Sequence, residues 1–206
     1  MKTPATDKSF ARRGPAEHAV RDQIIAAARD YFTHYGYDKT TVADLAREIG
    51  FSKAYIYRFF ESKQAIGQAI CNDRLTLLFD QVRAAVDDGA DPIDKLRKFS
   101  KTVANASVEM FFTDRKLYEI AAHASLEKWS SAQAYHQRLE QLLEAILKEG
   151  RESGVFERKT PLDEIRRSIF YSLRQFIDPM LLQHSLDILP DAENEVMGLV
   201  LRSLAP

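Results

Sequence analysis

The stretch from residue 40 to residue 66, TTVADLAREIGFSKAYIYRFFESKQAI, places three helix starts within 27 residues and a glycine near its middle. Thr41, Ser52 and Ser62 are residue types that cap helix N-termini, and Gly50 is typical of a helix end. A helix of two turns is marginal in water and must be held by its neighbours. We therefore expect short helices packed against each other, with a sharp turn at Gly50.

The same pattern matches the geometry of a helix-turn-helix, in which two helices joined by a tight turn cross at roughly 90–120°. Leu45, Ala46 and Ile49 are spaced to face inward on the first helix, as Ile56 is on the second. A narrow second helix that exposes polar and aromatic side chains fits the major groove of DNA. The positions predicted to stay exposed are Lys53, Ala54, Tyr55, Tyr57 and Arg58.

Composition favours an all-α protein. The 206 residues include only eight Gly and seven Pro, and no long stretch alternates as a half-buried strand would. No apolar run approaches the roughly 18 residues of a membrane span, and the first 18 residues lack the apolar core of a secretory signal. The single cysteine, Cys71, excludes an internal disulfide framework. We expect a cytoplasmic protein with no membrane partner.

Apolar spacing divides the chain into an arm and two domains. Residues 1–16 read as a flexible basic arm, and residues 17–63 as the helix-turn-helix domain, whose first helix ends at Gly36. Residues 64–206 then form a helical bundle for ligand binding and dimerisation, connected through a helix over 63–86. Further helices are expected over 92–112, 113–127, 130–152 and 161–183, with a last one that runs to about residue 204.

The charges are distributed unevenly along the chain. The net charge of −1 does not by itself indicate a nucleic-acid partner. Residues 1–63, however, carry eleven Lys and Arg against eight Asp and Glu, so the basic excess lies in the same third of the chain as the helix-turn-helix. This asymmetry supports DNA binding without establishing it, because a solvated surface can produce the same imbalance.

The helix-turn-helix segment resembles the DNA-binding domain of the TetR family of bacterial transcriptional regulators, over about residues 17–70. The resemblance implies a regulator and not an enzyme: a repressor that binds a palindromic DNA operator as a homodimer and is released by a small apolar ligand. The ligand would bind in the C-terminal domain. The residues that carry the family pattern are Thr41, Val42, Leu45, Ala46, Gly50, Phe51, Ser52, Ile56, Tyr57, Phe60, Ser62 and Lys63.

The resemblance implies two kinds of contact with double-stranded DNA. Hydroxyl groups and a lysine bind phosphate oxygens, whereas Arg pairs with guanine and a methyl group lies against thymine. Arg12 and Arg13 of the arm could reach a minor groove or form a solvated tail, and Tyr57 could instead be a core residue. The implied phosphate contacts are Thr41, Ser52, Tyr57 and Lys63. The implied base contacts are Lys53, Ala54, Tyr55 and Arg58.

An inducer pocket between the helices of the second domain is also implied. Such pockets are lined by apolar side chains with a few polar groups. Aromatic residues at helical spacing are more often core, so a core position is the alternative for each candidate. Trp129 follows Lys128 at a helix break and could be partly exposed. The candidates are Ser107, Met110, Phe111, Tyr118, His123, Trp129, Phe170 and Arg174.

The last two helices carry apolar residues on more than one face. A helix that packs only on its own domain needs a single apolar stripe, so the excess predicts a second packing partner. In the family that the chain resembles, the last two helices pair into a dimer interface. The candidate interface residues are Leu173, Phe176, Met180, Val196, Leu199 and Val200.

Other classes of protein fit the sequence less well. No Ser-His-Asp order, phosphate-binding loop or Gly-rich dinucleotide turn is present, so no cofactor is expected. Glu119, His123 and Glu127 share one helix face, which leaves a metal-responsive regulator as an alternative; a single row cannot surround an ion without further ligands, so we expect no metal site. An activator is a further alternative, whereas a purely structural protein has no use for the exposed recognition surface.

Overall fold

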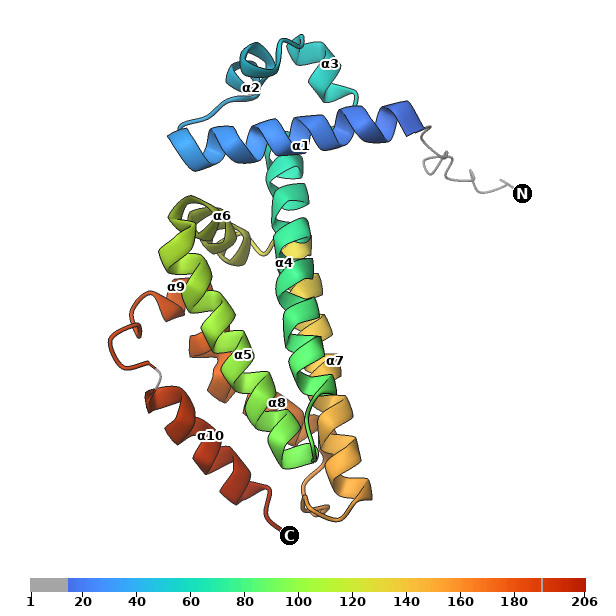
Figure 1. Ribbon diagram of the computed structural model, residues 1–206, viewed down its shortest axis with the longest axis vertical. Helices are drawn as coiled ribbons and strands as arrows, with labels where there is room; N and C mark the ends of the chain where they lie inside the picture. Colours follow the sequence, from blue (N-terminus) through green and yellow to red (C-terminus); the bar gives the residue numbers. More distant parts are fainter. Residues whose placement is uncertain (1–14, 190) are drawn as a thin grey trace, which may run out of the picture.

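The computed structural model describes residues 15–189 and 191–206, and this part of the chain contains helices and turns but no strand. The predicted all-α fold is therefore confirmed. Figure 1 shows α1, α2 and α3 at one end of the molecule, with α1 lying across the end of α4. The helices are α1 (Pro15–Tyr35), α2 (Val42–Ile49), α3 (Lys53–Tyr57), α4 (Lys63–Asp87), α5 (Pro92–Thr113), α6 (Arg115–Leu126), α7 (Ser130–Glu152), α8 (Leu162–Ile177), α9 (Pro179–Leu182) and α10 (Asp191–Ser203).

The helix starts predicted between residues 40 and 66 are confirmed. The Thr41 hydroxyl accepts a hydrogen bond from the Asp44 N–H at 3.2 Å, and the Ser52 hydroxyl accepts one from the Tyr55 N–H at 3.1 Å. Ser62 caps α4 in the same way. Gly50 ends α2 with a φ of 78°, a left-handed conformation that glycine adopts without a steric penalty. These caps satisfy backbone groups that the short helices cannot satisfy themselves.

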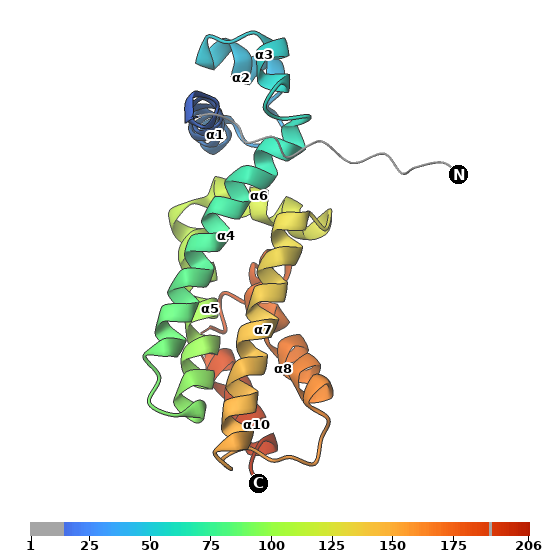
Figure 2. The same cartoon turned by 90° about the vertical axis from the view of Figure 1, so that its right-hand side faces the viewer.

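The long helix α4 joins the two parts of the molecule. Its 25 residues span about 37 Å at 1.5 Å per residue. We call α1–α3 with the first turns of α4 the N-terminal domain, and the rest of α4 with α5–α10 the bundle. In the bundle α4 runs beside α5 and α7 (Figure 2). None of the described helices combines the length and the apolar character that a membrane span requires.

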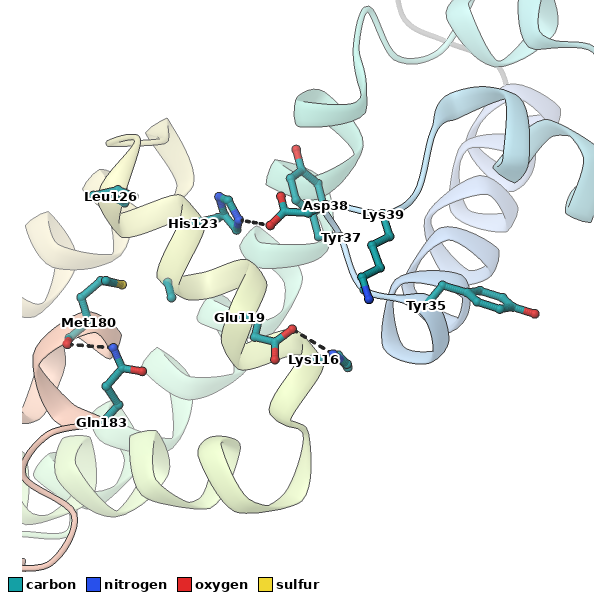
Figure 3. A pocket seen from close by; sticks show the side chains of 12 residues that line it. Tyr35, Tyr37, Asp38, Lys39, Lys116, Glu119, His123, Leu126, Met180 and Gln183 are labelled. Carbon is teal, nitrogen blue, oxygen red and sulfur yellow. Dashed lines mark hydrogen bonds and ion pairs between the residues drawn. The ribbon is translucent and has the colours of Figure 1, made fainter.

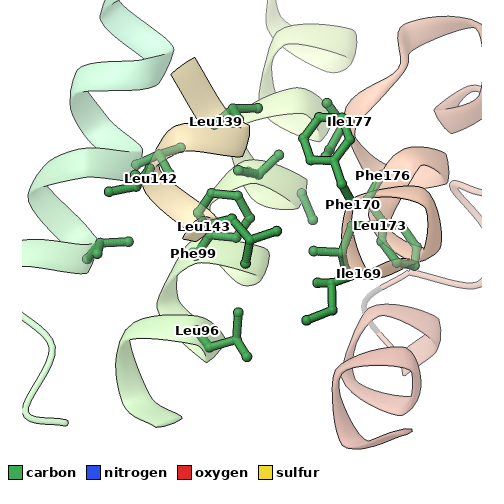
Figure 4. Packing of buried hydrophobic residues seen from close by; sticks show 14 of the residues in the cluster. Leu96, Phe99, Leu139, Leu142, Leu143, Ile169, Phe170, Leu173, Phe176 and Ile177 are labelled. Atoms are coloured by element: carbon green, nitrogen blue, oxygen red, sulfur yellow. The ribbon is translucent and has the colours of Figure 1, made fainter. Parts of the chain in front are cut away.

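The core of the bundle lies between α5, α7 and α8, whose apolar faces meet as Figure 4 shows. Each of these helices buries one stripe at three- and four-residue spacing, as an amphipathic helix does. Helices α9 and α10 pack against α5 and α8 of this core. Its central side chains are Leu96, Phe99, Leu139, Leu142, Leu143, Ile169, Phe170, Leu173, Phe176 and Ile177.

A second core unites the N-terminal domain with α6 and the start of α7. Trp129 is only 1% exposed and lies against Gly67 of α4, with its ring centroid 5.6 Å from that of Tyr37. Its indole N–H donates to Glu127 Oε2 at 2.7 Å, so the buried polar group is satisfied. The expectation that Trp129 is partly exposed is therefore wrong. The left-handed Lys128, with a φ of 54°, makes the turn that directs the indole inward.

The helix expected over 161–183 is interrupted. It ends at Ile177, and a separate single turn, α9, follows from Pro179. Proline has no N–H and disfavours a helical conformation in the residue before it, and Asp178 is accordingly extended, with a ψ of 119°. The buried Asp178 carboxylate caps α9 through the Met180 N–H at 2.9 Å and accepts a hydrogen bond from Ser125 of α6 at 3.1 Å.

The contact between Gly67 and Trp129 predicts a site where alanine is not tolerated. A Cβ on Gly67 would lie 2.9 Å from Trp129 Cη2 and 3.0 Å from Tyr37 Cε2. Overpacking of this kind costs about 1–3 kcal/mol, whereas Gly to Ala inside a helix gains about 0.5–1 kcal/mol. We expect Gly67→Ala to lower the free energy of unfolding by about 1–2 kcal/mol in urea titrations.

Gly198→Ala in α10 is the matched control, because the nearest atom to its Cβ is Arg202 Nη1 at 3.5 Å. This variant should keep or slightly raise stability. Equal stabilities of the two variants would contradict the close packing at Gly67.

Candidate functional site

The outer face of α3 carries the exposed residues that the sequence predicts. Ile56 is fully buried and Phe60 is nearly so, and together they hold α3 against the rest of the N-terminal domain. Lys53, Ala54 and Arg58 are exposed as a result. Tyr57 is 43% exposed, which argues against its being a core residue. Two cationic groups and a methyl group therefore stand together on one short helix.

Tyr55 differs from the expectation, because its side chain is half-buried. Its ring packs between those of Phe51 and Phe59, at centroid distances of 5.0 Å and 5.4 Å. The Arg58 guanidinium lies 5.4 Å from the Tyr55 centroid, within the range of a cation–π contact. Tyr55 thus positions Arg58 as well as presenting its own edge. The four-residue spacing of the three aromatic rings is the signal that could have predicted this.

Thr41 and Ser52, the other hydroxyl-bearing candidates, are exposed at the starts of α2 and α3. Both oxygens are already used in capping, and Thr41 Oγ1 also donates to Asp44 Oδ2 at 2.6 Å. Hydrogen bonds from Thr41 hold the pKa of the Asp44 carboxyl below its usual range. Arg12 and Arg13 lie outside the described residues.

Lys63 does not stand free for a phosphate contact. Its ammonium donates to the backbone carbonyl of Tyr37 at 3.0 Å and lies 4.2 Å from the centroid of the Tyr37 ring. This interaction ties the start of α4 to the turn between α1 and α2. The sequence implied a phosphate contact, but the ammonium is directed inward, and we assign Lys63 a structural role instead.

A cavity of about 410 Å³ separates the N-terminal domain from α6 and α9. Figure 3 shows residues of the α1–α2 turn on one side, and His123 and Met180 on the other. A hydrogen bond between His123 Nε2 and Asp38 Oδ2, 3.0 Å apart, joins the two sides. His123, predicted for a pocket inside the bundle, therefore lies at the junction between the domains. The role of Asp38 had no signal in the sequence.

The row of Glu119, His123 and Glu127 does not form a metal site. Glu119 pairs with Lys116 at 3.2 Å, His123 pairs with Asp38, and Glu127 binds the Trp129 indole. Each member of the row therefore has its own partner. Within residues 15–189 and 191–206 there is no cluster of three or more His, Cys, Asp or Glu side chains that could hold a metal ion.

Most of the other predicted pocket residues are packed into the hydrophobic cores. Ser107, Met110, Tyr118 and Phe170 are buried in the bundle, and burial raises the pKa of Tyr118 to about 12. Tyr118 donates its hydroxyl proton to the Pro179 carbonyl. Phe111 is half-buried, and Arg174 is exposed and pairs with Asp178 at 3.5 Å; Trp129 belongs to the second core. The core alternative therefore describes the buried residues better than the pocket interpretation.

A second cavity, of about 440 Å³, lies in the bundle between α5 and the segment that leads into α10. Its floor is mainly apolar, and two leucines from the irregular segment after α9 close one side. The sequence does not predict this cavity, because it forms only where α5, the segment after α9 and the start of α10 meet in three dimensions. The lining residues are Lys101, Ala104, Asn105, Val108, Phe112, Leu186, Leu189, Glu193 and Asn194.

The candidates for the dimer interface fall into two groups. Leu173, Phe176 and Val200 are buried in the core of their own chain, so they are not part of a spare apolar face, and the prediction is wrong for them in this respect. Leu199 is 61% exposed on α10, and Met180 and Val196 are half-buried. Tyr171 on α8, which the sequence did not single out, is 65% exposed.

The inward position of Lys63 makes a testable prediction about stability. Lys63→Ala removes a hydrogen bond from a charged donor and the cation–π contact with the Tyr37 ring, while the Tyr37 carbonyl keeps its bond from the Thr40 N–H, so the free energy of unfolding should fall by about 1 kcal/mol. Lys53→Ala, at an exposed lysine of the same domain, should leave stability unchanged. Urea unfolding of both variants checks this. If Lys63→Ala is as stable as the wild-type protein, the structural role of Lys63 is wrong.

Both domains match models of known protein families. Residues 24–70 match the model described as bacterial regulatory proteins, tetR family, and residues 92–196 match that of a tetracyclin repressor-like C-terminal domain. Between them the two matches cover most of the chain.

Individual relatives extend the similarity beyond the helix-turn-helix. The HTH-type transcriptional regulator TtgR of Pseudomonas putida is 27% identical over 200 residues, covering 91% of this chain and 93% of the relative. The HTH-type transcriptional repressor KstR2 of Mycolicibacterium smegmatis is 24% identical over 151 residues, 72% of this chain and 73% of the relative. The fold matches that of FadR from Bacillus subtilis, solved in complex with stearoyl-CoA, with a TM-score of 0.64 at 20% identity, over 89% of this chain and 98% of that chain.

Proposed function

The chain belongs to the TetR family of bacterial regulatory proteins, and from this premise we propose that it acts as a homodimeric repressor released from a palindromic operator by a small ligand. As a member of this family it is a DNA-binding transcriptional regulator and not an enzyme. Beyond this family-level function, we propose that the protein is a dimer, binds a palindromic operator, represses transcription and is controlled by a ligand. A regulator of this kind acts on chromosomal DNA, so the proposal places it in the cytoplasm.

The observation that carries the proposal is the exposed face of α3. Arg58 and Lys53 offer the donors that recognise guanine and phosphate, and Ala54 offers a methyl group for thymine. The cation–π contact with Tyr55 restricts the Arg58 guanidinium, so less entropy is lost when it binds a base edge. Thr41, Ser52 and Tyr57 flank this face and are proposed to contact phosphates.

Dimerisation is supported by the exposed apolar residues of the last helices. Leu199 and Tyr171 present large apolar side chains to solvent on α10 and α8, and half-buried Val196 lies beside Leu199 along α10. Two copies that bury these residues against each other would be related by a two-fold axis, as most homodimers are. A two-fold dimer presents its recognition helices to half-sites about 34–36 Å apart, or a multiple of that distance.

Ligand control is supported by the route from the bundle to the N-terminal domain. Phe112 lines the 440 Å³ cavity, and α6 begins only three residues later at Arg115, after its cap Asp114. His123, further along α6, bonds Asp38 of the N-terminal domain. A ligand that displaces the end of α5 would therefore move α6 and tilt α3. The coupling needed is about 1–3 kcal/mol, and it acts equally in both directions.

The chemistry of the ligand is apolar in this proposal. The cavity has an apolar floor, and the solved relative from Bacillus subtilis binds stearoyl-CoA, whose tail is apolar. A titration of the ligand with and without saturating operator DNA tests the control. Equal ligand affinities in the two titrations would contradict it, because coupling is reciprocal.

The proposed base contact predicts a loss of specificity. Arg58→Ala should weaken operator binding by about 1–3 kcal/mol and random DNA much less, because a bidentate Arg–guanine contact is specific to the base. The operator is obtained by selecting the genomic fragments that the protein binds, and affinity is measured by fluorescence anisotropy at fixed salt. Lys101→Ala, in the bundle, is the control of equal charge change. If the variant loses equal affinity for operator and random DNA, Arg58 does not contact a base.

The proposed interface predicts the oligomeric state of a surface variant. Leu199→Glu places a charge where two apolar faces would meet, so the protein should shift from dimer to monomer at micromolar concentration in light scattering. Leu77→Glu, at an apolar residue of α4 that is exposed to a similar degree, should leave the mass unchanged. A wild-type monomer that binds a palindrome tightly would contradict the dimer.

A further inference from the structure

Glu193 is a buried carboxylate without a cationic partner. It lies in the first turn of α10, is 4% exposed, and accepts a hydrogen bond from Ser100 of α5. No Lys, Arg or His of the described residues forms an ion pair with it. Burying a carboxylate costs free energy unless a cation or several hydrogen bonds compensate for the lost water. One hydroxyl and the partial positive charge of a helix N-terminus compensate only part of that cost.

Glu193 is also one of the residues that line the 440 Å³ cavity between α5 and α10. Val108, Leu186 and Leu189 supply apolar surface there, and the ring of Phe112 is largely exposed. Lys101 lines the cavity too, but its side chain is exposed and it makes no ion pair with Glu193 in the structure. An acidic residue thus lines a mainly apolar space that is large enough for a small molecule.

We propose that this cavity binds a cationic amphipathic molecule, an alkyl or aryl ammonium compound, whose ammonium group pairs with Glu193. The apolar part of the molecule contacts Val108, Leu186 and Leu189, and an aromatic ring such as that of Phe112 attracts a cation further. The ligand supplies a counter-ion that no residue of the described part of the chain provides. This inference rests on the proposed function, because it specifies the ligand class that would control DNA binding.

The charge of the ligand distinguishes this proposal from control by an apolar or an acidic ligand. A carboxylate head would bring a like charge to the buried Glu193, and a neutral head would give it no counter-charge. An ammonium group on the same chain would bring the opposite charge. Three probes with one eight-carbon body therefore test it: octylamine, which is an ammonium ion at pH 7, octanol and octanoate.

Isothermal titration calorimetry of the full-length protein with each probe gives the dissociation constants. We expect octylammonium to bind at least about tenfold more tightly than octanol, and octanoate to bind most weakly. Glu193→Gln keeps the shape of the side chain and should remove the preference for the cation. Glu195→Gln, an exposed acid two residues away with the same change in net charge, should preserve it.

Two further measurements keep the result interpretable. Val108→Trp fills the cavity and should abolish binding of both octylammonium and octanol, with folding checked by circular dichroism. If Glu193→Gln fails to fold, the order of the three probes on the wild-type protein decides instead. Octanol or octanoate binding as tightly as octylammonium, or unchanged binding to Val108→Trp, would overturn the inference.

Failure of this inference is distinguishable from failure of the proposed function. Preference for octanol or octanoate would refute the cationic ligand while leaving control by an apolar ligand intact. Bound octylammonium that leaves operator affinity unchanged would instead count against the proposed control of DNA binding, and the site itself would stand.

Discussion

The packing of Trp129 against Gly67 is the contact on which the arrangement of the two domains depends. The indole belongs to the loop before α7, yet it is buried in the core of the N-terminal domain beside Tyr37. Only a residue without a side chain leaves room for it on α4. Lys63 and the pair of His123 with Asp38 fix the same turn from two other directions. The recognition surface is therefore held by the bundle and does not swing freely on α4.

The break at Asp178 and Pro179 determines the path of the chain after α8. Because α8 cannot continue, the chain turns at α9, and Met180 and Gln183 reach the cavity beside the N-terminal domain. The segment that follows brings Leu186 and Leu189 to the cavity beside α10. The break at one proline thus brings the residues after α8 to two cavities, and α6 lines the first of them.

The helix-turn-helix could be predicted from the sequence because its information is local. Caps at Thr41, Ser52 and Ser62 and the turn at Gly50 act within four residues, and Ile56 fixes which face of α3 is buried. The exposure of Lys53, Ala54, Tyr57 and Arg58 then follows, whatever the rest of the chain does. The sequence does not predict the orientation of the Tyr55 and Lys63 side chains, because each packs against an aromatic ring: Phe51 for Tyr55 and Tyr37 for Lys63.

The sequence by itself determined the all-α class, the positions of the helices apart from the break between α8 and α9, and most of the recognition surface, because periodicity and capping are properties of neighbouring residues. Only the tertiary structure decided which apolar residues are buried in the core and which remain exposed on the surface. Leu173 and Leu199 are the same residue type on two amphipathic helices, yet one is buried and the other is exposed. The same holds for Glu193, since an acidic residue in the first turn of a helix is ordinary in the sequence and becomes unusual only because the fold buries it.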